Sequence, residues 1–210
     1  MSGQNYFGPC YTLRVNNFIK SPLSAIFTGV ISGLLVGFYI SQTGGYESDE
    51  MFFFGFVFGL PTSLYLVLLL SKLKRRWIDF MKVFVIWVPA SGASWYLALQ
   101  AGFSNHNLFF TDVSDGMFAV ILIGGFVGAA IMGAAFATIS KNDFGYSLMF
   151  ILLLSICAAI AAVSGFFLDF FLDEDVQFIM HILWQTTILY LIHRNLFVNN
   201  SEELVEQVYR

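Results

Sequence analysis

Three polar side chains recur at steps of four along the last apolar segment of the chain. Gln177, His181 and Gln185 would lie on one face of a helix, because residues four positions apart are neighbours on its surface. Amide and imidazole groups can both donate and accept hydrogen bonds, so this stripe could bind a polar solute. Lipid cannot satisfy such groups, and we therefore expect the stripe to face the interior of a helix bundle.

A carboxylate stands close to this stripe in the sequence. Asp169 lies near the end of the preceding apolar segment, and a short turn over 171–176 separates the two segments. Asp169 and His181 could therefore meet at similar depth, where a histidine beside a carboxylate can carry or sense a proton. The alternative is an interfacial pair that caps the hairpin, and both interpretations stay open.

Two prolines lie at about the middle of other apolar segments, and small hydroxyl residues follow each of them. Pro61 precedes Ser63, and Pro89 precedes Ser91 and Ser94. A proline inside a helix removes a backbone hydrogen bond and crowds the carbonyl four residues earlier. We expect interrupted helices here, whose freed carbonyls and hydroxyls could line a solute path. The alternative is an ordinary kink in which the hydroxyls bond to their own backbone.

The candidate residues of a solute path therefore come from four segments. They are Pro61, Ser63, Pro89, Ser91, Ser94, Asp169, His181 and Gln185. No pattern typical of a catalytic nucleophile and base, a metal cluster, a phosphate loop or a nucleic-acid surface accompanies them. The sequence thus predicts no enzyme activity, no cofactor, no metal site and no nucleic-acid partner.

Six apolar segments must position these residues. They cover about 23–40, 51–71, 78–101, 117–140, 146–170 and 177–193. A helix needs roughly 20 apolar residues to cross the hydrocarbon core, and each segment is long enough. Strands of a membrane barrel would alternate polar and apolar residues, which these segments do not. The sequence therefore predicts an all-α integral membrane protein, a six-transmembrane-helix bundle that forms one domain over 21–193.

The composition supports a location in the lipid bilayer. Of the 210 residues, 58% are hydrophobic and 11% are charged. Soluble domains have about 25% charged residues. The charged residues of this chain are therefore too few to cover a globule in water.

Basic and acidic residues are sorted onto opposite sides of the predicted bundle. Four bases gather in 72–76, while the connections 41–50, 102–116 and 171–176 carry acids and no base. The positive-inside rule then places the tails 1–20 and 194–210 in the cytoplasm. We expect this N-in, C-in topology in a plasma (inner) membrane.

Small residues form stripes on two of the predicted helices. They are Ala25, Gly29, Gly33 and Gly37 on the first helix, and Gly124, Gly128 and Gly133 on the fourth. Membrane helices use small residues to bring their backbones close together. These stripes favour packing within the bundle, but one of them could instead dock a second copy or a partner membrane subunit.

Two functions fit these observations. The first is a small solute carrier, or the solute-binding membrane subunit of a transporter, which would use the proline segments and the last helix. The layout is loosely similar to that of the substrate-binding components of vitamin transporters, although no specific motif accompanies the likeness. The alternative is a structural or assembly subunit of a larger membrane complex, which the packing stripes and the shortage of buried charge favour.

Overall fold

The structure, a computed structural model, describes residues 18–43, 51–72, 77–109, 113–140, 144–172 and 178–209, and every regular element in these ranges is a helix. The first two long helices are α2 (Pro22–Thr43) and α3 (Met51–Lys72). One helical run then comprises α4 (Trp77–Lys82), the π-helix η1 (Val83–Trp87) and α5 (Val88–Phe109). The last three helices are α6 (Val113–Ser140), α7 (Phe144–Phe171) and α8 (Phe178–Tyr209).

Five stretches of helix in the described ranges are long and apolar enough to cross a membrane. They are Pro22–Gln42, Phe53–Ser71, Phe80–Ala101, Val120–Ser140 and Ser147–Phe171. These stretches coincide with five of the six predicted segments, so the chain is a helical membrane protein with several spans. Except for Gln177, which lies outside the described residues, the sixth predicted span over 177–193 lies within α8, where several polar residues lower the hydropathy. Its crossing stays a prediction, as do the sides on which the two termini lie.

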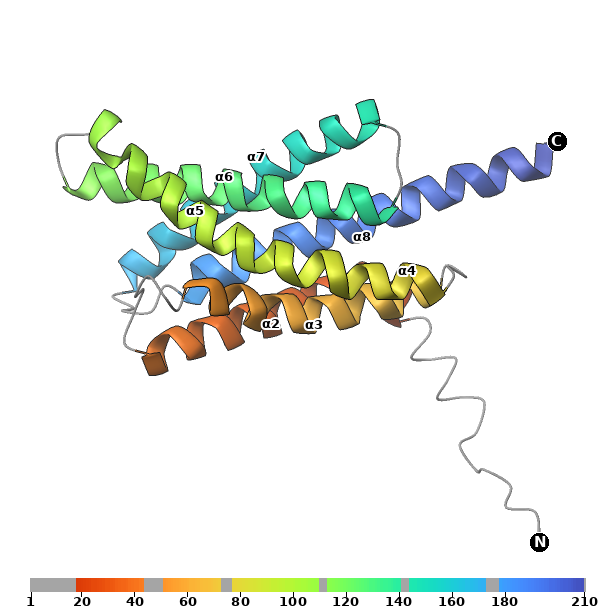
Figure 1. Ribbon diagram of the computed structural model, residues 1–210, viewed down its shortest axis with the longest axis horizontal. Coiled ribbons are helices and arrows are strands. Elements are labelled where there is room, and N and C mark those ends of the chain that lie inside the picture. The colour runs from red at the N-terminus through yellow and green to blue at the C-terminus, as the bar shows by residue number, and fades with distance from the viewer. Residues whose placement is uncertain are drawn as a thin grey trace, which may run out of the picture.

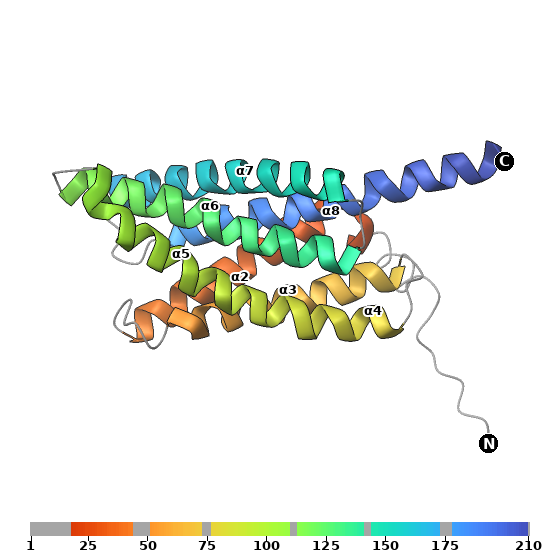
Figure 2. The same ribbon diagram turned by 45° about the horizontal axis from the view of Figure 1, so that its top comes forward.

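The long helices pack into a closed ring. Each of α2, α3, α5, α6, α7 and α8 lies beside the next one, and α8 returns to pack along α2 (Figures 1 and 2). The last part of α8 continues beyond the other helices, towards the C-terminal end of the chain (Figure 1). This closure brings residues from the two ends of the sequence into contact.

Large side chains fill the ring, and apolar side chains cover much of its outer face. The fully buried side chains include Phe54, Phe58, Trp87, Phe136 and Ile188. The exposed ones include Leu34, Leu64, Val85, Met149 and Ile160. An exposed apolar surface of this extent would be a liability in water, but it is what contact with lipid requires.

The predicted interruption at Pro61 is wrong, because α3 runs through this residue without a break. Around the second proline, the departure from α-helix comes earlier, as the π-helix Val83–Trp87 directly before Val88 and Pro89. Proline offers no N–H to the preceding turn, and its ring crowds the carbonyl there. The wider π turn relieves that crowding while the helix continues.

Candidate functional site

Gln185 of α8 lies near mid-depth in the bundle. Its side chain is fully buried, and its Oε1 accepts a hydrogen bond from the Ser32 hydroxyl of α2. Ser32 stands halfway along Pro22–Gln42, a stretch of helix long and apolar enough to cross a membrane. The amide nitrogen of Gln185 has no hydrogen-bond partner. Leaving such a buried group unsatisfied costs about 1–3 kcal/mol.

Trp95 of α5 reaches across the ring to the same part of α8. Its ring centroid lies 5.0 Å from that of His181 and 6.0 Å from that of Trp184. The indole nitrogen of Trp95 is buried without a hydrogen-bond partner, whereas that of Trp184 donates to the Gly125 carbonyl of α6 at 3.2 Å. We call Ser32, Trp95, His181, Trp184 and Gln185 the central cluster.

Two phenylalanines of α3 complete the aromatic surroundings of the central cluster. The ring of Phe54 lies 5.9 Å from that of Trp95, and the ring of Phe58 lies 5.9 Å from that of Trp184. Side chains from α2, α3, α5 and α8 therefore meet inside the ring of helices. The unpartnered nitrogens of Trp95 and Gln185 therefore lie in a largely apolar part of the bundle that is rich in aromatic side chains.

Asp169 of α7 caps the beginning of α8. One carboxylate oxygen accepts the backbone N–H of Ile179 and the other accepts that of Met180, both at 2.9 Å. The first N–H groups of a helix have no partner within the helix, and an acidic side chain also suits the positive end of the helix dipole. Both oxygens of this buried carboxylate thus stabilise the hairpin, while the ring of His181 packs on Trp95.

Residues close to the two prolines in the sequence join α3 to the helical run of η1 and α5 by hydrogen bonds. The indole N–H of Trp87 donates to the Thr62 hydroxyl at 2.8 Å, and the Ser91 hydroxyl lies 2.7 Å from the Gly55 carbonyl. The Thr62 hydroxyl in turn donates to the Phe58 carbonyl at 2.8 Å. We call the contact made by Gly55, Thr62, Trp87 and Ser91 the α3–α5 seam.

The remaining hydroxyls near the prolines bond to their own helices. Ser63 donates to the Leu60 carbonyl at 2.7 Å, and Ser94 donates to the Ser91 carbonyl at 3.0 Å. Pro61 is half-buried and Pro89 is exposed on the outer face. The candidate hydroxyls at the prolines therefore have acceptors, in contrast to the open donors of Trp95 and Gln185.

The small residues proposed for packing or a partner interface are all buried against helices of the same chain. They are Ala25, Gly29, Gly33, Gly37, Gly124, Gly128 and Gly133. A Cβ atom on Gly29 would lie 2.5 Å from the Thr186 Cα of α8, and one on Gly33 would lie 2.6 Å from the Ile182 Cα. The stripe on α2 is thus where the ring closes, and it offers no open surface to another protein.

A second polar cluster, which the sequence analysis missed, joins α2, α3 and α8 near Lys20. His193 Nε2 lies 3.2 Å from the Lys20 carbonyl, which can only accept, so this nitrogen donates. In a neutral imidazole Nδ1 is then an acceptor, and it receives the Tyr65 hydroxyl at 2.6 Å. The Ser24 hydroxyl lies 3.3 Å from that of Tyr65. No sequence spacing reveals this cluster, because three distant segments form it.

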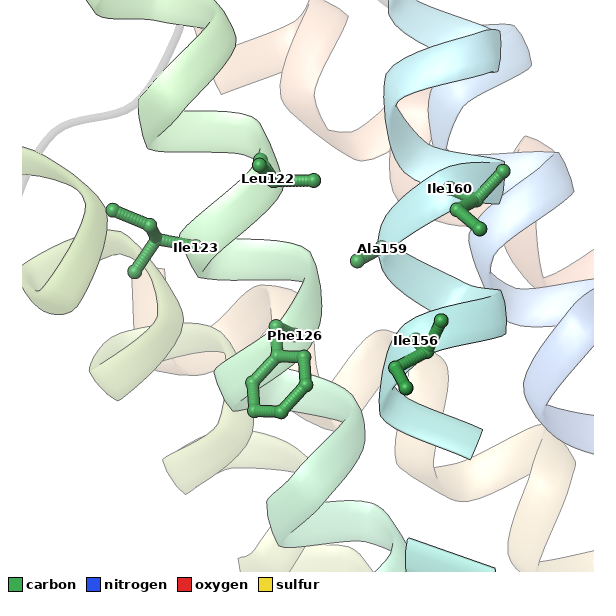
Figure 3. A pocket seen from close by; sticks show the side chains of 6 residues that line it. All are labelled: Leu122, Ile123, Phe126, Ile156, Ala159 and Ile160. Carbon is green, nitrogen blue, oxygen red and sulfur yellow. The ribbon is translucent and has the colours of Figure 1, made fainter. Parts of the chain in front are cut away.

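An apolar groove lies on the other side of the molecule, between α6 and α7. Its volume is about 360 Å³, and Figure 3 shows the side chains that line it. They are Leu122, Ile123, Phe126, Ile156, Ala159 and Ile160. This lining offers no polar side chain to orient a polar solute, so the groove suits an apolar occupant.

Comparisons with known proteins assign no identity to these sites. No family model, no curated protein and no solved structure matches the chain. In the part of the chain that the structure describes, no group of three or more His, Cys, Asp and Glu side chains is placed to hold a metal ion. The geometry of the described residues is therefore what any functional assignment must rest on.

Proposed function

We propose that this membrane protein binds a small solute at the central cluster, as a carrier or as the solute-binding membrane subunit of a transporter. The observation that supports this most is the buried Gln185 amide, whose nitrogen lacks a partner. It stands near mid-depth, where transporters place their solute sites. The unpartnered Trp95 nitrogen belongs to the same cluster.

A bound solute would explain why the fold tolerates these groups. Each open donor destabilises the empty protein, and a ligand that accepts its hydrogen bond removes this cost. The groups are therefore suited to bind something that the folded chain alone does not provide. A purely structural role would be served better by apolar side chains of similar volume.

The proposal includes a sixth span formed by the first half of α8, with both termini in the cytoplasm. The basic residues of the connections support this orientation. A single cysteine at Ser201, in a variant without Cys10 and Cys157, tests it by labelling with a membrane-impermeant thiol reagent. Labelling in inside-out but not right-side-out vesicles is expected, and the opposite pattern would contradict the topology.

The solute site is tested by thermal unfolding of the purified full-length protein with a panel of small metabolites. At 100 times its dissociation constant, a ligand stabilises a protein by about 2.7 kcal/mol, which shifts the melting temperature measurably. We expect at least one metabolite to stabilise the wild type and not Gln185→Leu. Ser63→Ala is the matched control, because the Ser63 hydroxyl bonds to its own helix. Equal stabilisation of wild type and Gln185→Leu by every active metabolite would refute this site.

A second candidate function is a structural or assembly subunit of a larger membrane complex. The apolar groove between α6 and α7 favours it, because a partner helix could cover this surface. The mass of the intact protein, extracted in mild detergent, tests it. A stoichiometric partner protein would support the assembly function, while a lone monomer or a homodimer would contradict it.

A further inference from the structure

We propose that Lys20 and Arg194, together with the outer face of α2 at Leu23, Phe27 and Ile31, bind an anionic phospholipid. We call these five residues the lipid site. The inference is independent of the proposed solute site, because it uses no residue of the central cluster. Three observations lead to it: two exposed bases on neighbouring helices, the fixed backbone beside them, and an exposed apolar face that continues from Lys20.

The two bases lie at the same end of adjacent helices. Lys20 stands just before the apolar stretch Pro22–Gln42, and Arg194 directly follows the predicted span 177–193. Both side chains are exposed. The Lys20 carbonyl lies 3.2 Å from Nε2 of His193, the residue directly before Arg194, so the backbones of the two bases lie side by side. Bases that flank an apolar span stand at the depth of the lipid headgroups.

The backbone at Lys20 is held in place by side chains of three helices. The Ser24 hydroxyl of α2 donates to the Ile19 carbonyl at 3.0 Å, and His193 of α8 donates to the Lys20 carbonyl. His193 is itself fixed by the Tyr65 hydroxyl of α3 at 2.6 Å. The two bases therefore start from a backbone that is already ordered, which lowers the entropic cost of binding a ligand between them.

An exposed apolar face of α2 continues from Lys20 towards the middle of the helix. Leu23, Phe27 and Ile31 are spaced by four residues, so they share one side of α2. Their side chains are 63%, 58% and 38% exposed. Bases at headgroup depth and an apolar face beside them match the two parts of a phospholipid, its phosphate and its acyl chains. A soluble anion would use the bases alone.

The charges at this end of the bundle favour a ligand with a net negative charge. Asp169 is the only acidic side chain that the structure describes, and it caps the beginning of α8, far along the helix from Arg194. No carboxylate of the described residues therefore competes for the two bases. A guanidinium can bind a phosphate through two N–H groups, and a lysine adds a point charge. The cationic group of a zwitterionic lipid would oppose both bases.

Native mass spectrometry of the purified full-length protein tests this site with two probe lipids. Phosphatidylglycerol is anionic and phosphatidylcholine is zwitterionic, and both are offered together, with the same acyl chains, in an uncharged detergent. The variants are Lys20→Gln, Arg194→Gln and the double variant. Lys82→Gln is the matched control, because it removes the same charge from α4, which packs on α3 and η1.

We expect the wild type to bind phosphatidylglycerol at least roughly tenfold more tightly than phosphatidylcholine. Each single substitution should weaken the binding of phosphatidylglycerol by roughly fivefold, the effect of one base beside an anionic lipid surface. The double variant should lose most of the preference, while Lys82→Gln should keep it. Binding of phosphatidylcholine should change little in every variant, which also shows that the variants are folded.

Three results would overturn the proposal. The first is equal binding of the two lipids by the wild type. The second is a preference that survives in the double variant, or that falls as much in Lys82→Gln, because phosphatidylglycerol would then bind through the overall charge of the protein. The third is displacement of the bound lipid by inorganic phosphate but not by sodium chloride of equal ionic strength, because the bases would then recognise a free anion.

Discussion

The α3–α5 seam and the central cluster both bury polar side chains inside apolar helices, but they satisfy them differently. In the seam, Trp87 donates to Thr62, and Ser91 has two carbonyls within reach. In the central cluster, the nitrogens of Trp95 and Gln185 have no partner. Both regions bury polar side chains, but only the central cluster has hydrogen-bond donors without a partner in the protein.

The difference comes from the length of the side chains and from their helices. In the seam, the hydroxyls of Thr62 and Ser91 reach carbonyls four and three residues earlier in the chain, so each has a local partner. The amide of Gln185 and the indole of Trp95 extend away from their helices and depend on what the neighbouring helices provide. The Ser32 hydroxyl donates to Oε1 of Gln185. Among the described residues, no group accepts a hydrogen bond from the Gln185 amide nitrogen or from the Trp95 indole nitrogen.

The largest effect should come from breaking the close approach in the α3–α5 seam. A Cβ atom on Gly55 would overlap backbone atoms of Ser91 and Gly92, which cannot move without separating the helices. We expect Gly55→Ala to lower the free energy of unfolding by about 3 kcal/mol, at the upper end of typical overpacking costs. Reversible unfolding in mixed detergent micelles would measure it.

Gly133→Ala provides the control for this change. Its Cβ would meet the Ile151 side chain at 3.1 Å, and a side chain can shift more easily than backbone. The control should therefore lose much less stability than Gly55→Ala. Equal losses at the two glycines would mean that the seam is no tighter than the contact between α6 and α7.

A pair of identical substitutions sharpens the comparison between the two regions. Trp87→Phe removes a donor that has a partner and leaves the Thr62 hydroxyl without it, while Trp95→Phe removes a donor that has none. The loss of packing is similar in both, so the difference reports on the hydrogen bond. We expect Trp87→Phe to lose about 2 kcal/mol more stability than Trp95→Phe. An equal loss would show that Trp95 has a partner in the folded protein.

Much of the fold could be predicted from the sequence, because the helices depend on local patterns. Five of the six predicted apolar segments coincide with helices that are long and apolar enough to cross a membrane. The difference in charge between the connections on the two sides predicts the orientation of these helices. The prediction failed at Pro61, where a proline was taken to interrupt α3. Thr62 and Ser63 bond back to carbonyls of the same helix, which helps the turn around Pro61 continue.

The candidate site could be predicted only in part. Steps of four on α8 correctly identified Gln185 as an inward-facing residue, since a buried amide needs the bundle interior. Trp95, Ser32 and the Tyr65–His193 pair were missed, because each looks like an isolated residue until the ring closes. Pairings between distant helices depend on packing, and no local pattern encodes them.

Gln185→Leu, measured without any ligand, should have the smallest effect on the free energy of unfolding. Whether this free energy rises or falls is the informative result. Leucine has a similar volume and removes the open amide nitrogen, while the Ser32 hydroxyl keeps the Gly29 carbonyl at 3.3 Å as an acceptor. Replacing an unsatisfied buried polar group with an apolar one should raise the free energy of unfolding by up to about 1 kcal/mol. Chemical unfolding of the purified variant would measure this change.

The comparison for this prediction is Ser91→Ala in the α3–α5 seam, where the hydroxyl has acceptors and its removal should cost about 1 kcal/mol. A gain at Gln185 beside a loss at Ser91 would mean that the wild type keeps its amide at the expense of stability, as expected for a group retained to bind a ligand. A loss at both positions would instead mean that the amide stabilises the folded protein. Gln185 would then resemble the seam, and the contrast between the two regions would disappear.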